Sequence, residues 1–224
     1  MHIEVLSLFP EYFQGPLSES MLKRAQEKAL IEINLVNIRD YALDKHRKVD
    51  DRPYGGGPGM VLMPEPLTRA IEARKREDTY VVYMSPQGEK LSASLAKEMA
   101  KKKEMLIICG HYEGIDERVI QKEVDKEISI GDFVLTNGCL AACVFIDAMS
   151  RFIEGVVGDQ KGVHEDSFES GLLDWPHYTR PENFEGMKVP QVLLSGNHKE
   201  IELWRKREAR KKTEVMRPDL YENS

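Results

Sequence analysis

The chain has 224 residues, of which 41% are hydrophobic and 31% charged, so it can bury a core without disulfides or metals. No apolar run approaches the length of about 18 residues that a transmembrane helix needs. The 32 Lys and Arg against 38 Asp and Glu give a formal charge of −6, which excludes a uniformly basic nucleic-acid binder. Any contact with nucleic acid must therefore use local basic patches.

The sequence also predicts the cellular compartment of the protein. Its first residues lack the basic stretch and long apolar segment of a signal peptide. The three cysteines, Cys109, Cys139 and Cys143, cannot all pair, as is typical of a reducing compartment. We therefore expect a cytoplasmic protein that does not associate with a membrane.

Strand-like and helix-like segments alternate through the first two thirds of the chain. Apolar runs predict strands, and amphipathic stretches between them predict helices, one of which Ser92 caps before the lysine run 101–103. This order predicts an α/β fold with a mainly parallel sheet covered on both faces. The strands are expected at 3–9, 31–35, 80–84 and 105–109, and the other helices at 16–28, 64–76 and 140–152.

Three polar or glycine-rich turns follow apparent strands, at 85–88, 110–114 and 130–132. Ligands of open parallel sheets bind beyond the carboxyl ends of the strands. The sequence therefore predicts a ligand site where these three turns converge.

Apolar periodicity is lost at 155–165, and the chain beyond is charged, aromatic and helical, most clearly at 197–216. We predict an α/β domain over 1–157, a linker over 158–165 and a small helical domain over 166–224.

Two clusters in the sequence lack the spacing of a standard binding motif. The glycine cluster 55–59 has neither the lysine of a P-loop nor the spacing of a dinucleotide fingerprint, which argues against a phosphate-transfer enzyme. A mobile loop that approaches a ligand and an ordinary turn both remain open for it. Cys139 and Cys143 lack further ligands at zinc-site spacing, so core packing is the preferred interpretation.

Several charged groups are compatible with either a functional or a purely structural role. Basic residues gather at 39–52, at 101–103 and at 205–212, where they could contact phosphates or form solvated surfaces. Asp166, Asp174 and His177 lie near Arg151 in sequence, either as capping and surface residues or as an acid–base group at a domain junction.

Seven segments together resemble the bacterial tRNA (guanine-N1)-methyltransferase family, TrmD, of the SPOUT superfamily. The resemblance runs essentially from end to end, and the motifs are highly specific in combination. The segments are 49–59, 83–88 (YMSPQG), 109–118 (CGHYEGIDER), 128–136 (ISIGDFVLT), 165–168, 172–181 and 189–198.

This resemblance implies a sheet threaded into a trefoil knot, which general topology rules would argue against. It further implies a homodimer whose active sites are completed by both subunits. The expected reaction is methylation of guanine N1 at tRNA position 37 by S-adenosylmethionine (SAM), with dependence on Mg²⁺ and no expected contact with DNA.

The family's functional residues carry over onto matching positions. Asp166 is implied as the general base and Arg151 as the cation that contacts and stabilises the guanine, while Glu113 is a possible Mg²⁺ ligand with Asp174 near it in the motifs. The residues implied to hold SAM are Tyr83, Met84, Ser85, Pro86, Gln87, Gly110, Tyr112, Glu113, Gly114, Ile130, Gly131, Asp132, Phe133, Val134, Leu135 and Gly138.

The chain departs from the family pattern at 137–141, where Asn-Gly-Cys-Leu-Ala replaces the more usual Gly-Gly-Glu-Leu-Pro/Ala. Asn137 tolerates left-handed backbone. Cys139 stands where the family usually has Glu, which removes a charge beside the implied SAM loop. Two alternatives therefore remain: a SAM- or RNA-binding module whose catalysis Cys139 impairs, and a SPOUT enzyme that modifies another RNA position.

Overall fold

The computed structural model describes residues 1–158, 162 and 166–222. They fall into two units, Met1–Gly158 and Asp159–Ser224, and each is described by itself. Apart from Gly158 and Gly162, the predicted linker 158–165 lies outside the described residues, so the proposed domain bounds stay a prediction.

The first unit is built on a five-stranded sheet in which every neighbouring pair is parallel. His2 lies in register with Glu32 on one side and Glu104 on the other, so β1 is flanked on both edges. The prediction of an α/β fold with a mainly parallel sheet is confirmed. In spatial order the strands are β2 (Glu32–Asn37), β1 (His2–Ser7), β6 (Glu104–Cys109), β5 (Tyr80–Lys90) and β7 (Lys126–Ser129).

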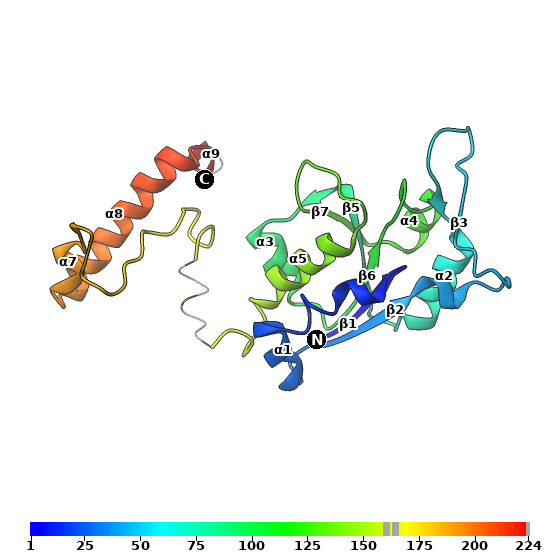
Figure 1. The fold of residues 1–224 in the computed structure, drawn as a ribbon, viewed down its shortest axis with the longest axis horizontal. Coiled ribbons are helices and arrows are strands. Elements are labelled where there is room, and N and C mark those ends of the chain that lie inside the picture. Colours follow the sequence, from blue (N-terminus) through cyan, green and yellow to red (C-terminus); the bar gives the residue numbers. More distant parts are fainter. Residues whose placement is uncertain (159–161, 163–165, 223–224) are drawn as a thin grey trace. The chain divides into compact units, whose positions relative to one another are not determined.

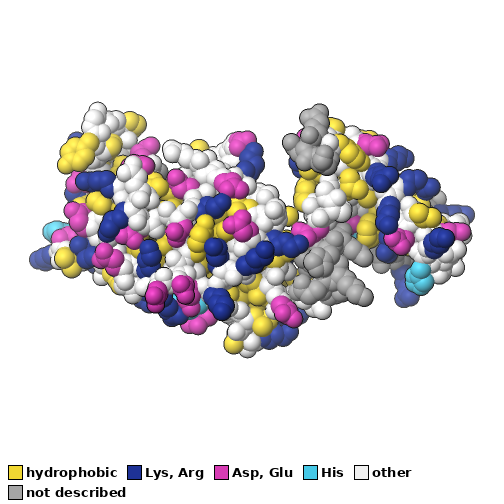
Figure 2. Space-filling view, turned by 180° about the vertical axis from the view of Figure 1, so that it is seen from behind, with side chains coloured by type: hydrophobic (Ala, Val, Ile, Leu, Met, Phe, Trp, Pro, Cys, Tyr) yellow, Lys and Arg dark blue, Asp and Glu magenta, His cyan; other side chains and the backbone are white. Residues whose placement is uncertain are grey.

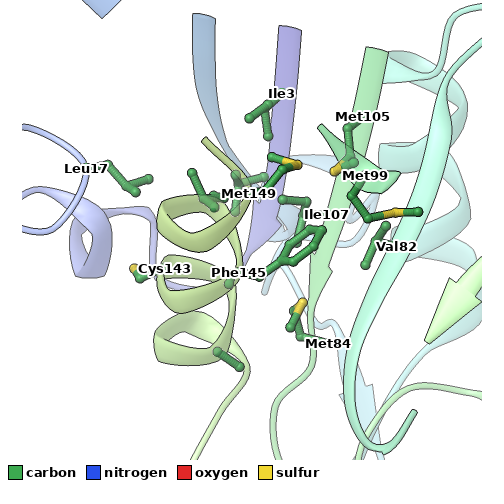
Figure 3. Close-up of a cluster of buried hydrophobic side chains, with 14 of the residues drawn as sticks. Ile3, Leu17, Val82, Met84, Met99, Met105, Ile107, Cys143, Phe145 and Met149 are labelled. Atoms are coloured by element: carbon green, nitrogen blue, oxygen red, sulfur yellow. The ribbon is translucent and has the colours of Figure 1, made fainter. Parts of the chain in front are cut away.

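Helices cover both faces of this sheet (Figure 1). On one face, α1 (Ser20–Glu27), α3 (Ala93–Met99) and α5 (Cys139–Ser150) enclose one buried apolar cluster. Figure 3 shows Phe145 pointing from α5 toward Met84 and Val82 of the sheet within that cluster. On the other face, α2 (Pro64–Arg74) and α4 (Glu117–Glu123) pack over a second cluster.

Local sequence explains why these elements begin where they do. The hydroxyl of Ser92 accepts a hydrogen bond from the Leu95 amide at 3.2 Å, so Ser92 caps α3 as predicted. Pro64 occupies the first turn of α2, where its missing N–H costs no helical hydrogen bond. β1 is buried along its whole length because it lies inside the sheet and is covered on both faces.

Two predicted elements differ from the structure. The helix expected from residue 16 begins only at Ser20, and a short 3₁₀ helix, η1 (Pro10–Phe13), precedes it. Residues 85–88, expected as a turn that closes a strand, lie within β5: Ile128 of β7 pairs with both Met84 and Glu89, so the segment between them bulges out of the ladder.

Short elements complete the first unit. The 3₁₀ helix η2 (Ile38–Tyr41) packs against α2, and the antiparallel pair β3 (Asp50–Asp51) and β4 (Val61–Leu62) brackets the glycine cluster.

The second unit consists of small elements around one long helix, α8 (His198–Met216). The hydroxyl of Thr213, fully buried on α8, accepts a hydrogen bond from the Leu173 amide at 2.9 Å and donates one to the Ala209 carbonyl at 2.8 Å. These bonds fasten the segment after residue 166 to the helix. The other elements are β8 (Asn183–Phe184), β9 (Met187–Lys188), α7 (Gln191–Leu194) and α9 (Asp219–Glu222).

Among the described residues, no helix combines the length and the apolar character needed to cross a membrane.

Candidate functional site

A cavity of about 270 Å³ opens at the carboxyl ends of β5, β6 and β7. The three segments that follow or interrupt these strands, 85–87, 110–114 and 130–131, all contribute to its wall. Segments far apart in the sequence therefore meet at one edge of the parallel sheet, where ligands of such sheets bind.

The first wall is the bulge of β5. The hydroxyl of Ser85, a buried residue, accepts a hydrogen bond from the Gln87 amide at 3.2 Å and shapes the bulge. A Cβ atom at Gly88 would overlap the backbone of Glu127 and Ile128. Glycine at this position is what lets β5 return against β7 after the bulge.

The second wall is the turn after β6, which touches the segment before α5. The Gly138 amide donates a hydrogen bond to the Gly110 carbonyl at 2.8 Å, and a Cβ at Gly138 would lie only 3.0 Å from the Gly110 nitrogen. Beside this contact the ring of Tyr83 is buried, and burial raises the pKa of its hydroxyl to about 12. The wall therefore presents backbone and a neutral phenol to the cavity.

The third wall runs from Ser129 to Gly138. The Ser129 hydroxyl donates to the Gly131 carbonyl at 3.0 Å, which tightens the turn after β7. Phe133 and Val134 line the cavity and remain largely exposed. Asp132 is not among the lining residues: its carboxylate is exposed and forms an ion pair with Lys90 at 2.8 Å.

The structure thus brings together all the residues expected to hold SAM except Asp132. Their role in cofactor binding stays a prediction. The cavity also includes residues that sequence reasoning missed, among them His111, Glu127, Thr136 and Asn137. The sequence signals for them are their places inside or beside the three turns and, for His111 and Thr136, inside the segments 109–118 and 128–136 that resemble the family.

His111 has the most structured surroundings of these additional residues. Its ring lies 5.2 Å from the ring of Phe9 and 4.6 Å from that of Tyr112, in an edge-on arrangement with the latter. Burial, followed by the charge of Arg39, lowers the pKa of His111 below its usual value. The imidazole is therefore predominantly neutral at pH 7 and adds a hydrogen-bonding group without charge to the wall.

Residues 137–139 show what the departures from the family pattern do locally. The Asn137 side chain accepts a hydrogen bond from the Cys139 amide at 2.9 Å, at the first residue of α5. Asn137 serves in this way as a helix-start residue rather than as a residue with left-handed backbone. Cys139 is buried behind the cavity and does not line it.

The two implied catalytic residues belong to different units. Arg151 directly follows α5 and is exposed, so α5 determines its position. Asp166 is half-buried, and its backbone carbonyl accepts a hydrogen bond from the Glu169 amide at 3.3 Å.

The side chains near Asp166 form a hydrogen-bonded group within the second unit. The Asp174 amide donates to the hydroxyl of Ser167 at 2.9 Å, and the Asp174 carboxylate lies 2.6 Å from Nε2 of His177. Asp174 and His177 are therefore in contact, and Ser167, which Asp174 also contacts, directly follows Asp166. The role of Asp166, Asp174 and His177 as an acid–base group stays a prediction.

Glu113 lies on the cavity wall and faces the glycine cluster. Its amide donates to the Met60 carbonyl at 3.0 Å, and a Cβ at Gly59 would overlap its carboxylate. Within the part of the chain that the structure describes, no three His, Cys, Asp or Glu side chains are grouped so that they could hold a metal ion. The described residues therefore offer one oxygen ligand and not a complete metal site.

Basic side chains are spread along α8 in the second unit, which Figure 2 shows from one side. Arg207, Arg210 and Lys211 are exposed. Arg205 instead stacks on Trp175, with its guanidinium carbon 4.7 Å from the ring centre. Acidic partners offset part of the charge in both units. Lys206 pairs with Glu202 and Arg207 with Glu208 on α8. In the cluster at 39–52, Arg47 pairs with Asp40 and Lys48 with Asp51.

Comparison with known proteins gives a match along the whole chain. The family model described as tRNA (Guanine-1)-methyltransferase TrmD matches residues 1–223. A relative from Protochlamydia amoebophila is 60% identical over 98% of this chain and 99% of its own length. Relatives from Carboxydothermus hydrogenoformans and Dictyoglomus turgidum are 54% and 50% identical over 98% and 100% of this chain, and 87% and 91% of their own lengths. All three are named tRNA (guanine-N(1)-)-methyltransferase.

Proposed function

Because the chain belongs to the TrmD family of tRNA (guanine-1)-methyltransferases, we propose that its target is guanine 37 of tRNA, next to the anticodon. The chain is an enzyme of tRNA processing that methylates N1 of guanine. The observation that carries this conclusion is the match over the whole chain to relatives at 50–60% identity.

The family implies SAM as the methyl donor, and the cavity suits it. Its lining includes Gly110, Gly131 and Gly138, where a Cβ would meet neighbouring atoms, so the backbone there is open for a bent ligand to approach amides and carbonyls. Its volume of about 270 Å³ lies near the lower end of small-molecule sites, which begin at roughly 300 Å³. When bound there, SAM supplies a methyl group activated by its positively charged sulfur.

We propose that the chain around this cavity is threaded into the trefoil knot of the SPOUT superfamily. The support comes from membership of the family, together with the backbone contact between Gly110 and Gly138. Such a contact would hold the turn after β6 against the segment that enters α5.

The chemistry requires a proton acceptor and a positive charge. Guanine N1 carries a proton at neutral pH, so its lone pair cannot attack until a base removes that proton. We propose that the Asp166 carboxylate accepts it and that Arg151 stabilises the negative charge that develops toward O6. The planar guanidinium suits this role because it stays charged and can donate two parallel hydrogen bonds.

We propose that the active site is completed by a second copy of the chain. Arg151 and Asp166 stand in different units, which is compatible with a site assembled from two subunits. Exposed apolar side chains also lie beside the cavity and on the adjoining α5, namely Phe133, Val134, Leu140 and Val144. Adjacent exposed apolar groups of this kind are typical of interaction surfaces.

Mg²⁺ dependence stays a prediction with Glu113 as the candidate ligand. Mg²⁺ in proteins usually keeps several waters and takes only one or two carboxylates, often with substrate phosphates. We assign no chemical step to the ion. We further propose that the enzyme works in the cytoplasm and binds tRNA rather than DNA.

The alternative of a module disabled by Cys139 has little structural support. The Cys139 side chain is buried against Ser7, with Sγ and Oγ 3.2 Å apart, and lies behind the cavity wall. Every residue implied in cofactor binding, apart from Asp132, lines the cavity in the presence of Cys139. The alternative of another RNA target is decided by mapping the methylated base.

The proposed base is tested by Asp166→Asn, with Asp78→Asn as the matched control because Asp78 is an exposed carboxylate outside the cavity. We expect Asp166→Asn to lower single-turnover methyl transfer by a factor on the order of 10² to 10⁴, because the amide cannot accept the N1 proton. SAM affinity, measured by calorimetry, should stay close to that of the wild type. Turnover of Asp166→Asn comparable to that of Asp78→Asn would rule out Asp166 as the base.

A further inference from the structure

Two cysteines flank the backbone contact that closes the cavity wall. Cys109 immediately precedes Gly110, and Cys139 immediately follows Gly138, so each adjoins one partner of the 2.8 Å hydrogen bond between those glycines. A Cβ at Gly138 would lie 3.1 Å from the Cys109 Cα, which shows how closely the two backbones approach. Both cysteines are 2% exposed, and each directly adjoins in sequence a glycine that lines the cavity.

Their side chains are close enough to shift each other's titration, and the Ser7 hydroxyl lies 3.2 Å from the sulfur of Cys139. The hydrogen bond from Cys109, with help from that of Ser7, lowers the pKa of Cys139 to about 7 against the effect of burial. The same hydrogen bond and burial raise the pKa of Cys109.

The third cysteine differs in both position and chemistry. Figure 3 shows Cys143 on the side of α5 toward Leu17, whereas Phe145 points toward the sheet. Burial raises the pKa of Cys143 to about 11, so it is a thiol at neutral pH. Of the three, Cys139 has the most thiolate character, and Cys109 is the thiol that contacts it.

We propose that Cys109 and Cys139 are a peroxide-sensitive pair whose disulfide distorts the cavity wall and weakens binding of the methyl donor. The disulfide itself does not depend on the proposed function, whereas its effect on SAM rests on that proposal. Transient, redox-sensing disulfides are the kind expected in a reducing compartment.

The reaction balances with hydrogen peroxide as the oxidant. The Cys139 thiolate attacks one peroxide oxygen, so that an S–O bond forms, the O–O bond breaks and hydroxide leaves to be protonated to water. The Cys109 sulfur then attacks the Cys139 sulfur: the S–S bond forms, the S–O bond breaks, and a second water leaves with the Cys109 proton. Two thiols are oxidised by two electrons, and one peroxide is reduced to two waters.

The bond would change the cavity because a disulfide is much shorter than a thiol hydrogen bond, at about 2.05 Å between sulfurs. The bond would tie the end of β6 to the start of α5. Gly110 and Gly138 adjoin the two bonded residues and line the cavity, so we expect the bond to constrain the cavity-lining backbone.

The chemical half of the proposal is tested on the full-length chain treated with hydrogen peroxide. We expect intact mass to fall by that of two hydrogens and peptide mapping to find Cys109 joined to Cys139. The reaction rate should rise with pH around a midpoint near 7, as Cys139 becomes a thiolate. Cys143→Ser should form the same disulfide, whereas Cys109→Ser and Cys139→Ser should not. Absence of a disulfide in the wild type, or a disulfide that includes Cys143, would overturn the proposal.

The binding half is tested by titrating SAM into reduced, oxidised and re-reduced wild-type protein. We expect roughly fivefold or greater weakening on oxidation, full recovery with dithiothreitol, and no peroxide effect in Cys139→Ser, which lacks the thiolate that attacks the peroxide. Equal affinity of the reduced and oxidised proteins would overturn the regulatory role. If the reduced protein did not bind SAM at all, the proposed function would fail while the mapped disulfide still stood.

Discussion

Single glycines determine the shape of the cavity. Gly88 and Gly138 each stand where a Cβ would meet backbone rather than a movable side chain. The backbone at both positions cannot shift without moving a neighbouring cavity-lining segment. Their replacement should therefore affect both folding and ligand binding.

Replacement of Gly88 by alanine tests this directly. The added methyl overlaps the backbone of Glu127 and Ile128, so we expect Gly88→Ala to lower the free energy of unfolding of the first unit by about 1–3 kcal/mol. Gly15→Ala is the control because nothing lies within 4 Å of its Cβ position, and its effect should stay within about 0.5 kcal/mol. Urea denaturation followed by the sheet's circular dichroism measures both. Equal stability of the two variants would contradict the close packing at Gly88.

The sequence predicted the helices and strands whose bounds depend on the local pattern of residues. The strand at 105–109 is observed as β6 (Glu104–Cys109), because a short continuous apolar run between a lysine run and a glycine is typical of a fully buried strand. Helix α8 (His198–Met216) likewise follows the expected range of 197–216. The bounds of these two elements can therefore be predicted from their own residues.

Other elements depend on contacts that the local pattern does not contain. Residues 85–88 include Pro86 and Gly88 and resemble a turn, yet the chain returns to pair with β7, which only the tertiary structure decides. Asp132 lies in a cavity-forming turn but is drawn away by Lys90 from the end of β5. The roles of Asp166 and Arg151 came from family resemblance, because sequence spacing says nothing about two residues in separate units.

Helix α8 carries the prediction for tRNA binding. Arg207→Gln, Arg210→Gln and Lys211→Gln together should weaken tRNA binding and lower the slope of log affinity against log salt by roughly 0.7–0.9 for each phosphate that the variant no longer neutralises. Fluorescence anisotropy with labelled tRNA at several salt concentrations measures the slope. A matched control is Lys101→Gln with Lys103→Gln, two exposed lysines of the first unit. If the α8 variant and this control had the wild-type slope, the α8 charges would be a solvated surface.

The proposed active site requires two copies of the chain. Arg151 and Asp166 lie in units that need not come from the same copy to form one site. The exposed apolar side chains of Leu140 and Val144 provide a surface that association would bury. If the active site is shared, two inactive variants should restore activity to each other when they form mixed dimers.

Mixing two inactive variants tests the shared site. Arg151→Ala and Asp166→Ala should each be inactive alone, whereas an exchanged mixture should regain about a quarter of wild-type activity. Half of the dimers formed at random are mixed, and each mixed dimer holds one intact site if the two residues come from different subunits. A mixture that exchanges subunits, as shown by differential tagging, yet stays inactive would place both residues in the same subunit.

We propose that this chain methylates N1 of guanine 37 in tRNA. The most direct measurement incubates it with labelled SAM, Mg²⁺ and two tRNA transcripts that differ only in guanine or adenine at position 37. We predict incorporation confined to the guanine transcript, with nucleoside mass spectrometry placing the methyl group on N1. Incorporation into both transcripts, methylation at another atom, or no incorporation despite binding of SAM and tRNA would contradict this claim.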